Sequence, residues 1–275
     1  YDGVLRIEVS QRQPLRRMAV EGYDCYVTAE GFTFPTPRLS SVYAPVVTGD
    51  YIPPVPAQYV GRVEDYILSL LAEADEQIEA LQHQKVPLFE REREINDSLR
   101  GVRKIRIEKR FWKELRLNFQ PSYQATYDLD VQRTRAYKAD LRRKYRYKLR
   151  MNTKAIEQIS AKQEVVRENQ KKLMKRYEDF AKLINFVKYI ENDSFWSAEI
   201  VQIVASTMSS GDLELELIPR TGNYVVEFGQ VGTKAEIEEK LDKLLAFYQK
   251  GLTNVGWDSF SRISIRYKGQ VVCSK

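Results

Sequence analysis

The side chains that most often carry out catalysis are few in this sequence and are not grouped. The single histidine, His83, lies in a polar stretch with helical spacing, and acid–base catalysis needs a positioned partner. Many carboxylates alternate with leucines, as at Asp212, Glu214 and Glu216, which is typical of a solvated strand face. The sequence has no glycine-rich phosphate loop, nucleophile elbow or metal-spaced Cys/His cluster. We therefore expect no enzymatic activity, no metal and no cofactor.

The two cysteines, Cys25 and Cys273, are too few for a disulfide framework or a metal site. Each lies in an apolar strand pattern, which favours a free, buried thiol. A disulfide between them in an oxidising compartment is the alternative.

The densest group of charges is a basic run with interleaved tyrosines, RRKYRYKLR at residues 142–150. Such a run could follow a phosphate backbone and stack on bases. On a helix, however, these cations surround the axis and do not form one groove-facing stripe. We therefore expect a solvated surface that meets anionic lipid or cell-wall polymer, and no nucleic acid. The cations concerned are Arg142, Arg143, Lys144, Arg146 and Lys148.

The basic character belongs to one segment of the 275-residue chain. Residues 85–194 hold 29 basic and 16 acidic residues, a net charge of +13, so the rest carries −7 of the total of +6. This segment also has almost unbroken helical periodicity, with patterns beginning near Gln58, from Leu88 to about Phe119 and from about Tyr123 to Ile190. Pro87 and Pro121 separate them. The pattern predicts antiparallel helices, similar to a coiled coil, that fold back at these two prolines.

Strand patterns flank the helical segment on both sides. Residues 4–9 alternate, residues 23–27 and 32–34 predict a hairpin, and residues 213–217 and 224–228 predict a second hairpin. A capping box at Thr233 and Glu236 begins a helix that we expect to end at Gly251. We therefore expect an α+β fold. A mixed or antiparallel sheet with packed helices is interrupted by a long antiparallel helical insertion.

The end of the chain alternates strictly from Arg262 to Lys268, which predicts a half-buried strand. Ile263, Ile265 and Tyr267 share one face, and Gly269 predicts a bulge or a bend. A last strand with one solvated face is suited to the edge of a sheet, where another chain can add a strand. An ordinary closing strand is the alternative.

Several short motifs in a fixed order resemble the FtsQ/DivIB cell division family, over residues 1–84 and about 185–275. The ordered set, rather than any single motif, carries the resemblance. The motifs are LRIEVSQRQPLR (5–16), AEGFTF (29–34), VVTG (46–49), FWSAEI (195–200), PRTG (219–222), FG (228–229), EKLDKLLAFY (239–248) and ISIRYKGQVVC (263–273).

The resemblance implies a non-enzymatic protein with a cytoplasmic tail, one transmembrane helix, a POTRA domain and a β-domain. Residues 1–18 would be the last strand region of a truncated POTRA domain. Residues 19–84 and 185–275 would form the β-domain, and residues 85–184 a helical insertion foreign to the family. The chain would then lie at the periplasmic face of the inner membrane, anchored by an upstream segment.

The resemblance also implies the partners, which are FtsB- and FtsL-like proteins of the division machinery that controls septal peptidoglycan synthesis. In the family, FtsB adds a strand beside the last strand of the β-domain. Arg266 would then pair with an acidic partner residue and Tyr267 would pack against the partner. The expected contact residues are Ile263, Ile265, Arg266, Tyr267, Lys268 and Gly269.

One family feature has no counterpart in this chain. A second arginine that pairs with the partner is replaced by Ser209, Ser210 and Gly211. The chemistry of the partner could therefore differ from that in the family.

Two other functions stay open. One is a polyanion- or nucleic-acid-binding protein that acts through the helical insertion, and the other is a POTRA-type subunit of outer-membrane assembly.

Overall fold

The computed structural model describes residues 12–20, 22–37, 44–106 and 121–275. The expected strand at residues 4–9 therefore lies outside the described residues. The chain divides into a sheet unit, residues 1–71 and 170–275, and a helical unit, residues 72–169. The family resemblance implied a helical insertion at residues 85–184, which begins and ends later than this helical unit. The difference arises because Phe180, Leu183 and Ile184 are buried in the core of the sheet unit.

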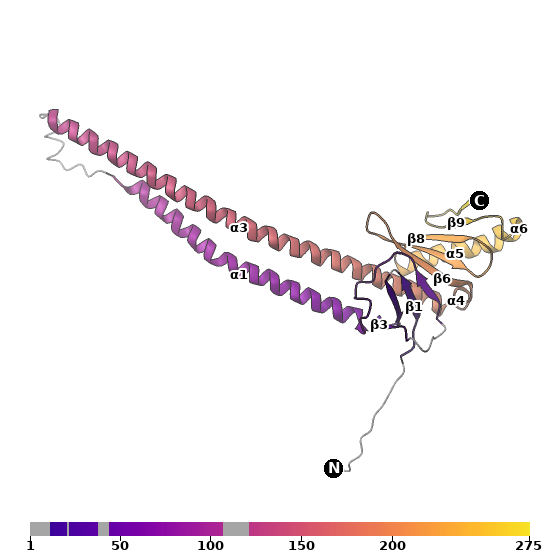
Figure 1. Ribbon diagram of the computed structural model, residues 1–275. Coiled ribbons are helices and arrows are strands. Elements are labelled where there is room, and N and C mark those ends of the chain that lie inside the picture. The colour runs from indigo at the N-terminus through magenta and orange to yellow at the C-terminus, as the bar shows by residue number, and fades with distance from the viewer. Residues whose placement is uncertain (1–11, 21, 38–43, 107–120) are drawn as a thin grey trace, which may run out of the picture. The chain divides into compact units, whose positions relative to one another are not determined.

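The sheet unit contains a mixed sheet, in which ten strands of the described residues follow the order β10-β9-β8-β7-β6-β4-β1-β2-β3-β5 (Figure 1). β1 pairs with β4, β4 with β6 and β8 with β9 in parallel, and the other neighbours are antiparallel. The α+β prediction is therefore confirmed. The strands are β1 (Arg16–Val20), β2 (Tyr23–Val27), β3 (Phe32–Pro35), β4 (Val46–Thr48), β5 (Gly61–Arg62), β6 (Ile200–Thr207), β7 (Leu213–Pro219), β8 (Val225–Gln230), β9 (Arg262–Ser264) and β10 (Val272–Ser274).

Both predicted hairpins are present, because β2 pairs with β3 and β7 with β8. The strand β1 was not expected. It joins this sheet through Arg16, Arg17 and Met18, residues that the sequence analysis placed in a truncated POTRA domain. Arg16 occupies an inward position on β1, which obscures the alternation.

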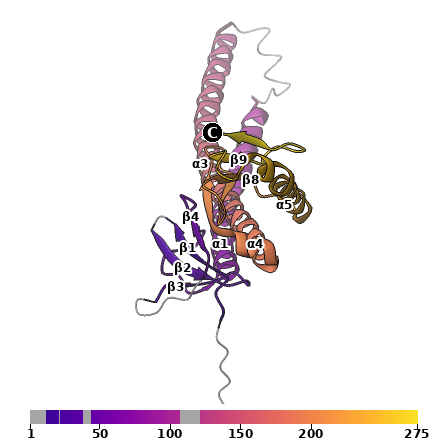
Figure 2. The same cartoon turned by 90° about the vertical axis from the view of Figure 1, so that its right-hand side faces the viewer.

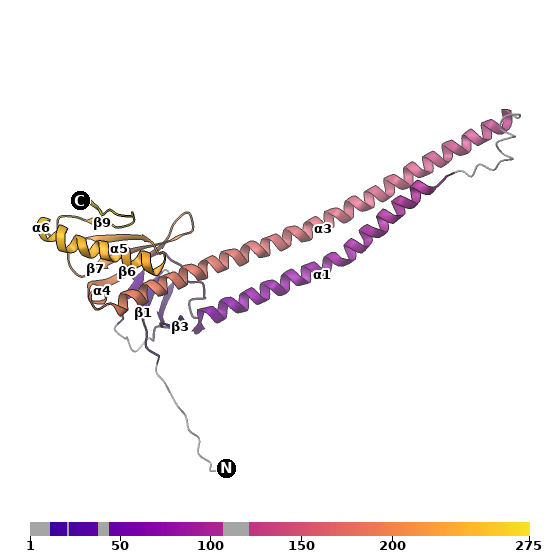
Figure 3. The same ribbon diagram turned by 180° about the vertical axis from the view of Figure 1, so that it is seen from behind.

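Helices cover one side of this sheet, as the view from behind shows (Figure 3). The last turns of α3 (Pro121–Asn192) bury Phe186, Val187 and Ile190, and α5 (Lys234–Phe247) buries its apolar stripe. Figure 2 shows α5 beside the strands β8 and β9, and the short α4 (Ser194–Glu199) leads directly into β6. The core therefore lies between the sheet and these helices, with Phe186 and Phe228 rings 4.7 Å apart.

The capping box that begins α5 is present, with Thr233 and Glu236 bonded reciprocally. The expected stop at Gly251 is wrong. The helix continues as a π-helical turn (Tyr248–Leu252) and α6 (Thr253–Val255) and ends at Gly256, whose φ of 99° favours glycine. Tyr248 and Leu252 are buried, so their packing extends the helix past Gly251.

The helical unit consists of segments of α1 (Val63–Lys104) and α3 that run antiparallel (Figure 1). Three buried polar side chains lie between them: Lys85, Asn152 and Gln163. Lys85 Nζ donates to Gln163 Oε1, Gln163 Nε2 donates to the Ile78 carbonyl at 3.1 Å, and Asn152 Nδ2 donates to the Leu88 carbonyl at 2.8 Å. Buried polar contacts of this kind fix the register of paired helices.

The prediction that Pro87 folds the chain back is wrong, because α1 continues through it from Val63 to Lys104. Contacts from Lys85 and Leu88 to α3 hold both sides of this proline against the neighbouring helix. Pro121 is the first residue of α3, where its missing N–H and fixed φ are tolerated. The chain therefore reverses between Lys104 and Pro121, of which residues 107–120 lie outside the described residues.

Candidate partner-binding site

The C-terminal segment forms a hairpin and not the single strand that the alternation predicted. β9 contains only Arg262–Ser264, and β10 returns antiparallel beside it, with Cys273 opposite Ile263. Gly269 lies in the turn with a φ of 72°, which an L side chain rarely adopts. The edge strand is therefore β10, while β9 lies between β8 and β10.

The alternation correctly predicts that Ile263 and Ile265 face the core and that Arg262 and Arg266 do not, whereas Ser264, expected on the solvated face, is buried. Ile263 and Ile265 are fully buried in the core, and the Ile265 N–H donates to the Glu227 carbonyl at 3.0 Å. Extended geometry therefore continues beyond the last residue of β9. Neither isoleucine side chain is accessible, so of the six expected contact residues only Arg266, Tyr267, Lys268 and Gly269 present side-chain or turn surface.

Arg266 belongs to an ion-pair network on the outer face of the sheet. Its Nη2 lies 3.1 Å from Glu214 Oε2, and its Nε lies 3.6 Å from Glu227 Oε2. Arg262 Nη1 contacts Glu227 at 2.7 Å and Glu216 at 3.2 Å. The Arg262 hydrogen bond, aided by the Arg266 charge, lowers the pKa of Glu227. Glu214 and Glu216, which the alternation with leucines placed on a solvated strand face, are thus intramolecular partners of these arginines.

A cavity of about 550 Å³ lies beside the end of β9. Lys243 Nζ donates to the carbonyls of Ile265 and Tyr267, and Lys240 Nζ donates to the Phe228 and Gln230 carbonyls. Burial lowers the pKa of both lysines. Tyr267, 56% exposed, lines the cavity together with Lys268. Arg266, Tyr267 and Lys268 therefore come together at one surface. The lysines of α5 that line the same cavity, Lys240 and Lys243, were not predicted from the strand pattern.

Among the described residues, Lys268 forms no ion pair, whereas Arg266 is already paired. A carboxylate that approaches this surface would therefore find Lys268 unpaired and would have to share Arg266 with Glu214 and Glu227. The ionised groups can hold an acidic segment, but they include no nucleophile paired with a base. The surface is suited to binding.

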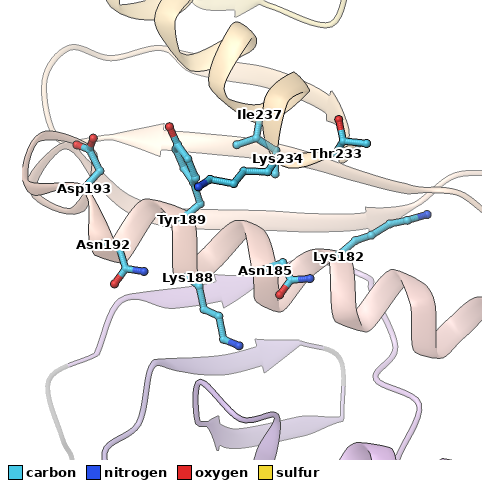
Figure 4. Close-up of a pocket in the computed structure, with 10 residues that line it drawn as sticks. Lys182, Asn185, Lys188, Tyr189, Asn192, Asp193, Thr233, Lys234 and Ile237 are labelled. Carbon is cyan, nitrogen blue, oxygen red and sulfur yellow. The ribbon is translucent and has the colours of Figure 1, made fainter.

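A second cavity, of about 560 Å³, lies between α3 and the first turn of α5 (Figure 4). Tyr189 points toward Lys234 and Ile237 of α5, while Lys188 extends to the other side of α3. Asp193, also at this cavity, accepts the Phe195 and Trp196 N–H groups and so caps α4. The sequence contains no local signal for this cavity, because its residues come mainly from two helices that are far apart in the chain.

The basic run lies on α3 within the helical unit. Arg142, Arg143, Lys144, Arg146 and Lys148 are all exposed, while Tyr145 and Leu149 are half-buried toward the helix pair. Within the part of the chain that the structure describes, none of these five cations pairs with a carboxylate. They are therefore available as a group to an anionic surface or polymer.

The cysteines are free, as the apolar strand pattern predicted. Burial raises the pKa of the Cys25 thiol, on β2, to about 11, and raises that of the Cys273 thiol, on β10. Cys25 is therefore a packing residue, while Cys273 is half-buried.

No helix of the described residues is long and apolar enough to cross a membrane. No curated protein and no solved structure matches the chain. Residues 144–274 match the model of a protein family described as FtsQ/DivIB, C-terminal related. The matched segment contains most of α3, the strands β6 to β10 and the C-terminal hairpin. Over this segment, the chain is similar to a family described as related to the C-terminal part of the cell division proteins FtsQ and DivIB.

Proposed function

We propose that this chain is a non-enzymatic scaffold of bacterial cell division that recruits partner proteins at its C-terminal sheet edge. The family match over residues 144–274 carries this proposal, because it includes the whole edge region. The resemblance suggests FtsB- and FtsL-like partners, a location at the periplasmic face of the inner membrane, and control of septal peptidoglycan synthesis as the outcome.

The open edge and its neighbouring side chains support strand addition as the binding mode. Among the strands that the structure describes, β10 ends the sheet order, so the C-terminal hairpin of β9 and β10 lies at an edge of the sheet. An extended partner segment gains affinity there from backbone hydrogen bonds and specificity from side-chain contacts. Tyr267 supplies exposed aromatic surface, and Lys268 supplies a cation for an acidic partner residue.

The direct test is a calorimetric titration of this chain with the periplasmic parts of FtsB and FtsL from the same organism. Tyr267→Ala is expected to weaken binding strongly, because exposed aromatic anchors dominate interfaces. Tyr137→Ala is the matched control, since Tyr137 lies on the helical unit and is 58% exposed, close to the 56% of Tyr267. Equal affinity of the two variants would exclude Tyr267 from the site. A folded wild-type chain that binds neither partner would refute the proposed function.

The basic run favours an additional contact between the helical unit and an anionic surface. Its five cations have no carboxylate partner among the described residues, and binding should weaken steeply with salt. The charge reversals Arg143→Glu and Arg146→Glu should abolish sedimentation with anionic vesicles or isolated cell-wall polymer. Arg91→Glu and Arg93→Glu are the control, since these arginines alternate with Glu90, Glu92 and Glu94. Equal loss in both pairs would indicate only a dependence on net charge.

A further inference from the structure

We propose that β10 is a removable cover, and that the partner's extended segment displaces it and pairs with the edge of β9 beneath. This inference rests on the proposed function, and it concerns how the partner docks. The C-terminal hairpin then has two states. In one, the chain covers its own edge, and in the other a partner strand takes the place of β10.

β10 is held weakly by its own contacts. It forms three residue pairs with β9, and Val272 is 46% exposed while Ser274 is also exposed. Of its three side chains, only Cys273 packs against the core. A Cβ atom placed on Gly269, in the connecting turn, would have no atom within 4 Å, so this part of the turn is not packed against the rest of the protein. Segments with few buried apolar contacts open at low free-energy cost.

β9 is held firmly and would remain in place. Ile263 and Ile265 are fully buried, and β8 pairs with β9 in parallel. Lys243 also binds the carbonyls of Ile265 and Tyr267. Removal of β10 would therefore expose a strand edge that the rest of the sheet already fixes.

The directions of the backbone groups favour displacement over addition to β10. The Ser274 carbonyl accepts from the Ser261 N–H, so Ser274 faces inward, toward β9. Backbone groups alternate along an antiparallel strand, so only Cys273 within β10 directs its N–H and carbonyl toward the open edge. The edge of β9 that β10 covers would offer the backbone N–H and carbonyl groups of two residues, Arg262 and Ser264. Strict alternation continues to Lys268, so residues 265–268 could extend β9 once β10 has left, and would then offer more backbone N–H and carbonyl groups to the partner.

A disulfide can lock the cover in place. Cys273 and Ile263 form a non-hydrogen-bonded pair, whose Cα atoms lie about 4.5 Å apart in antiparallel sheets, within the range of disulfides. We would titrate Ile263→Cys with the FtsB and FtsL periplasmic parts, oxidised and reduced. Displacement predicts that oxidation abolishes binding and that reduction restores it. Equal binding of both forms would refute displacement and leave the proposed function intact. Absent binding by the wild type would instead refute the proposed function.

A second pair of variants decides the question if Ile263→Cys does not fold. A chain that ends at Gln270 lacks β10 and should bind about tenfold more tightly, equivalent to about 1.4 kcal/mol. Cys273→Pro removes the outward N–H but no bond to β9, so displacement predicts unchanged or tighter binding. Addition to the edge of β10 predicts the reverse for both variants, namely loss of binding. Cys273→Val is the control, since it changes the side chain and keeps the N–H.

Discussion

Arg16 combines a charge with almost complete burial. Its side chain is 1% exposed, and its Nη2 lies 2.6 Å from Glu191 Oε1 on α3. Burial lowers the pKa of this arginine, which the Glu191 charge partly offsets. A buried ion pair adds little net stability, but loss of one partner leaves the other charge buried without compensation. The pair thus contributes little to the net free energy of folding, but it specifies which part of α3 packs against β1.

Replacement of Glu191 alone should therefore destabilise the sheet unit strongly. Glu191→Ala leaves the Arg16 guanidinium buried and unpaired, and we expect a loss of about 3–5 kcal/mol in the free energy of unfolding in urea. The double variant with Arg16→Leu should recover most of this loss, because no buried charge remains. If the double variant is no more stable than Glu191→Ala, the ion pair is not the cause.

Glu227 should make stability depend on acid pH. Its pKa in the folded state is lowered from the ordinary value of 4.5 by Arg262 and Arg266. A carboxyl with a lowered folded pKa adds stability that is complete above pH 4.5 and is lost as the pH falls through the folded pKa. Glu227→Gln should lower the melting temperature at pH 7, and the difference from wild type should shrink as the pH falls below 4.5 and through the lowered folded pKa. A constant difference would contradict this.

Single residues show what the sequence could and could not predict. The faces of Ile263 and Ile265 followed from alternation, because burial of one side of a strand imposes a period of two. The partners of Arg266 did not follow, because Glu214 and Glu227 belong to other strands and meet it only through the sheet order. Arg16 gave the opposite signal, since an arginine in a strand pattern predicts an exposed position.

At the scale of elements, α1 tolerates a proline in its interior. Pro87 cannot donate to the His83 carbonyl four residues before it, which removes a helical hydrogen bond. The pairing with α3 on both sides, through Lys85 and Leu88, compensates for this loss. A local breaker signal was therefore overridden by a contact between helices that sequence periodicity does not encode.

Pro87→Ala should consequently stabilise the helical unit. Alanine restores the donor and removes the steric conflict, which is worth up to about 3 kcal/mol in a helix interior. Thermal unfolding followed by circular dichroism should show the gain as a higher melting temperature. Val86→Ala, at a neighbouring exposed position, is expected to change it little. An unchanged melting temperature in Pro87→Ala would contradict a destabilising effect of Pro87 in α1.

The C-terminal hairpin illustrates the limit of strand patterns. Alternation extends from Arg262 to Lys268, yet the chain turns at Tyr267. The alternation could not predict this turn, because a local pattern does not specify whether the edge of a strand pairs with its own chain or with another. The glycine at 269 was the available signal, interpreted as a bulge or a bend. Its positive φ in the turn explains why the chain can reverse there.

At the scale of the whole molecule, the two units should be separable. Gln163 Nε2 lies 3.1 Å from the Ile78 carbonyl, so a short glycine-containing link can replace residues 79–162. We expect the shortened chain to keep its sheet and its affinity for the periplasmic partners, and to lose sedimentation with anionic vesicles. Circular dichroism and the same titration check both statements. Loss of partner binding by a folded shortened chain would give the helical unit a direct part in recruitment.

The bonds between α1 and α3 carry a consequence for how this chain can evolve. Two levels of bonds tie the two helices, Lys85 with Gln163 and Leu88 with Asn152, and a third joins Lys138 of α3 to the Ile105 carbonyl just beyond the end of α1. An insertion of one residue in α1 would shift all later levels against α3 and rotate them by about 100°. Length changes should therefore be inherited as matched pairs, one in each helix, in steps of about seven residues. Homologous chains with longer or shorter helical units are expected to differ by equal amounts on both sides of the reversal.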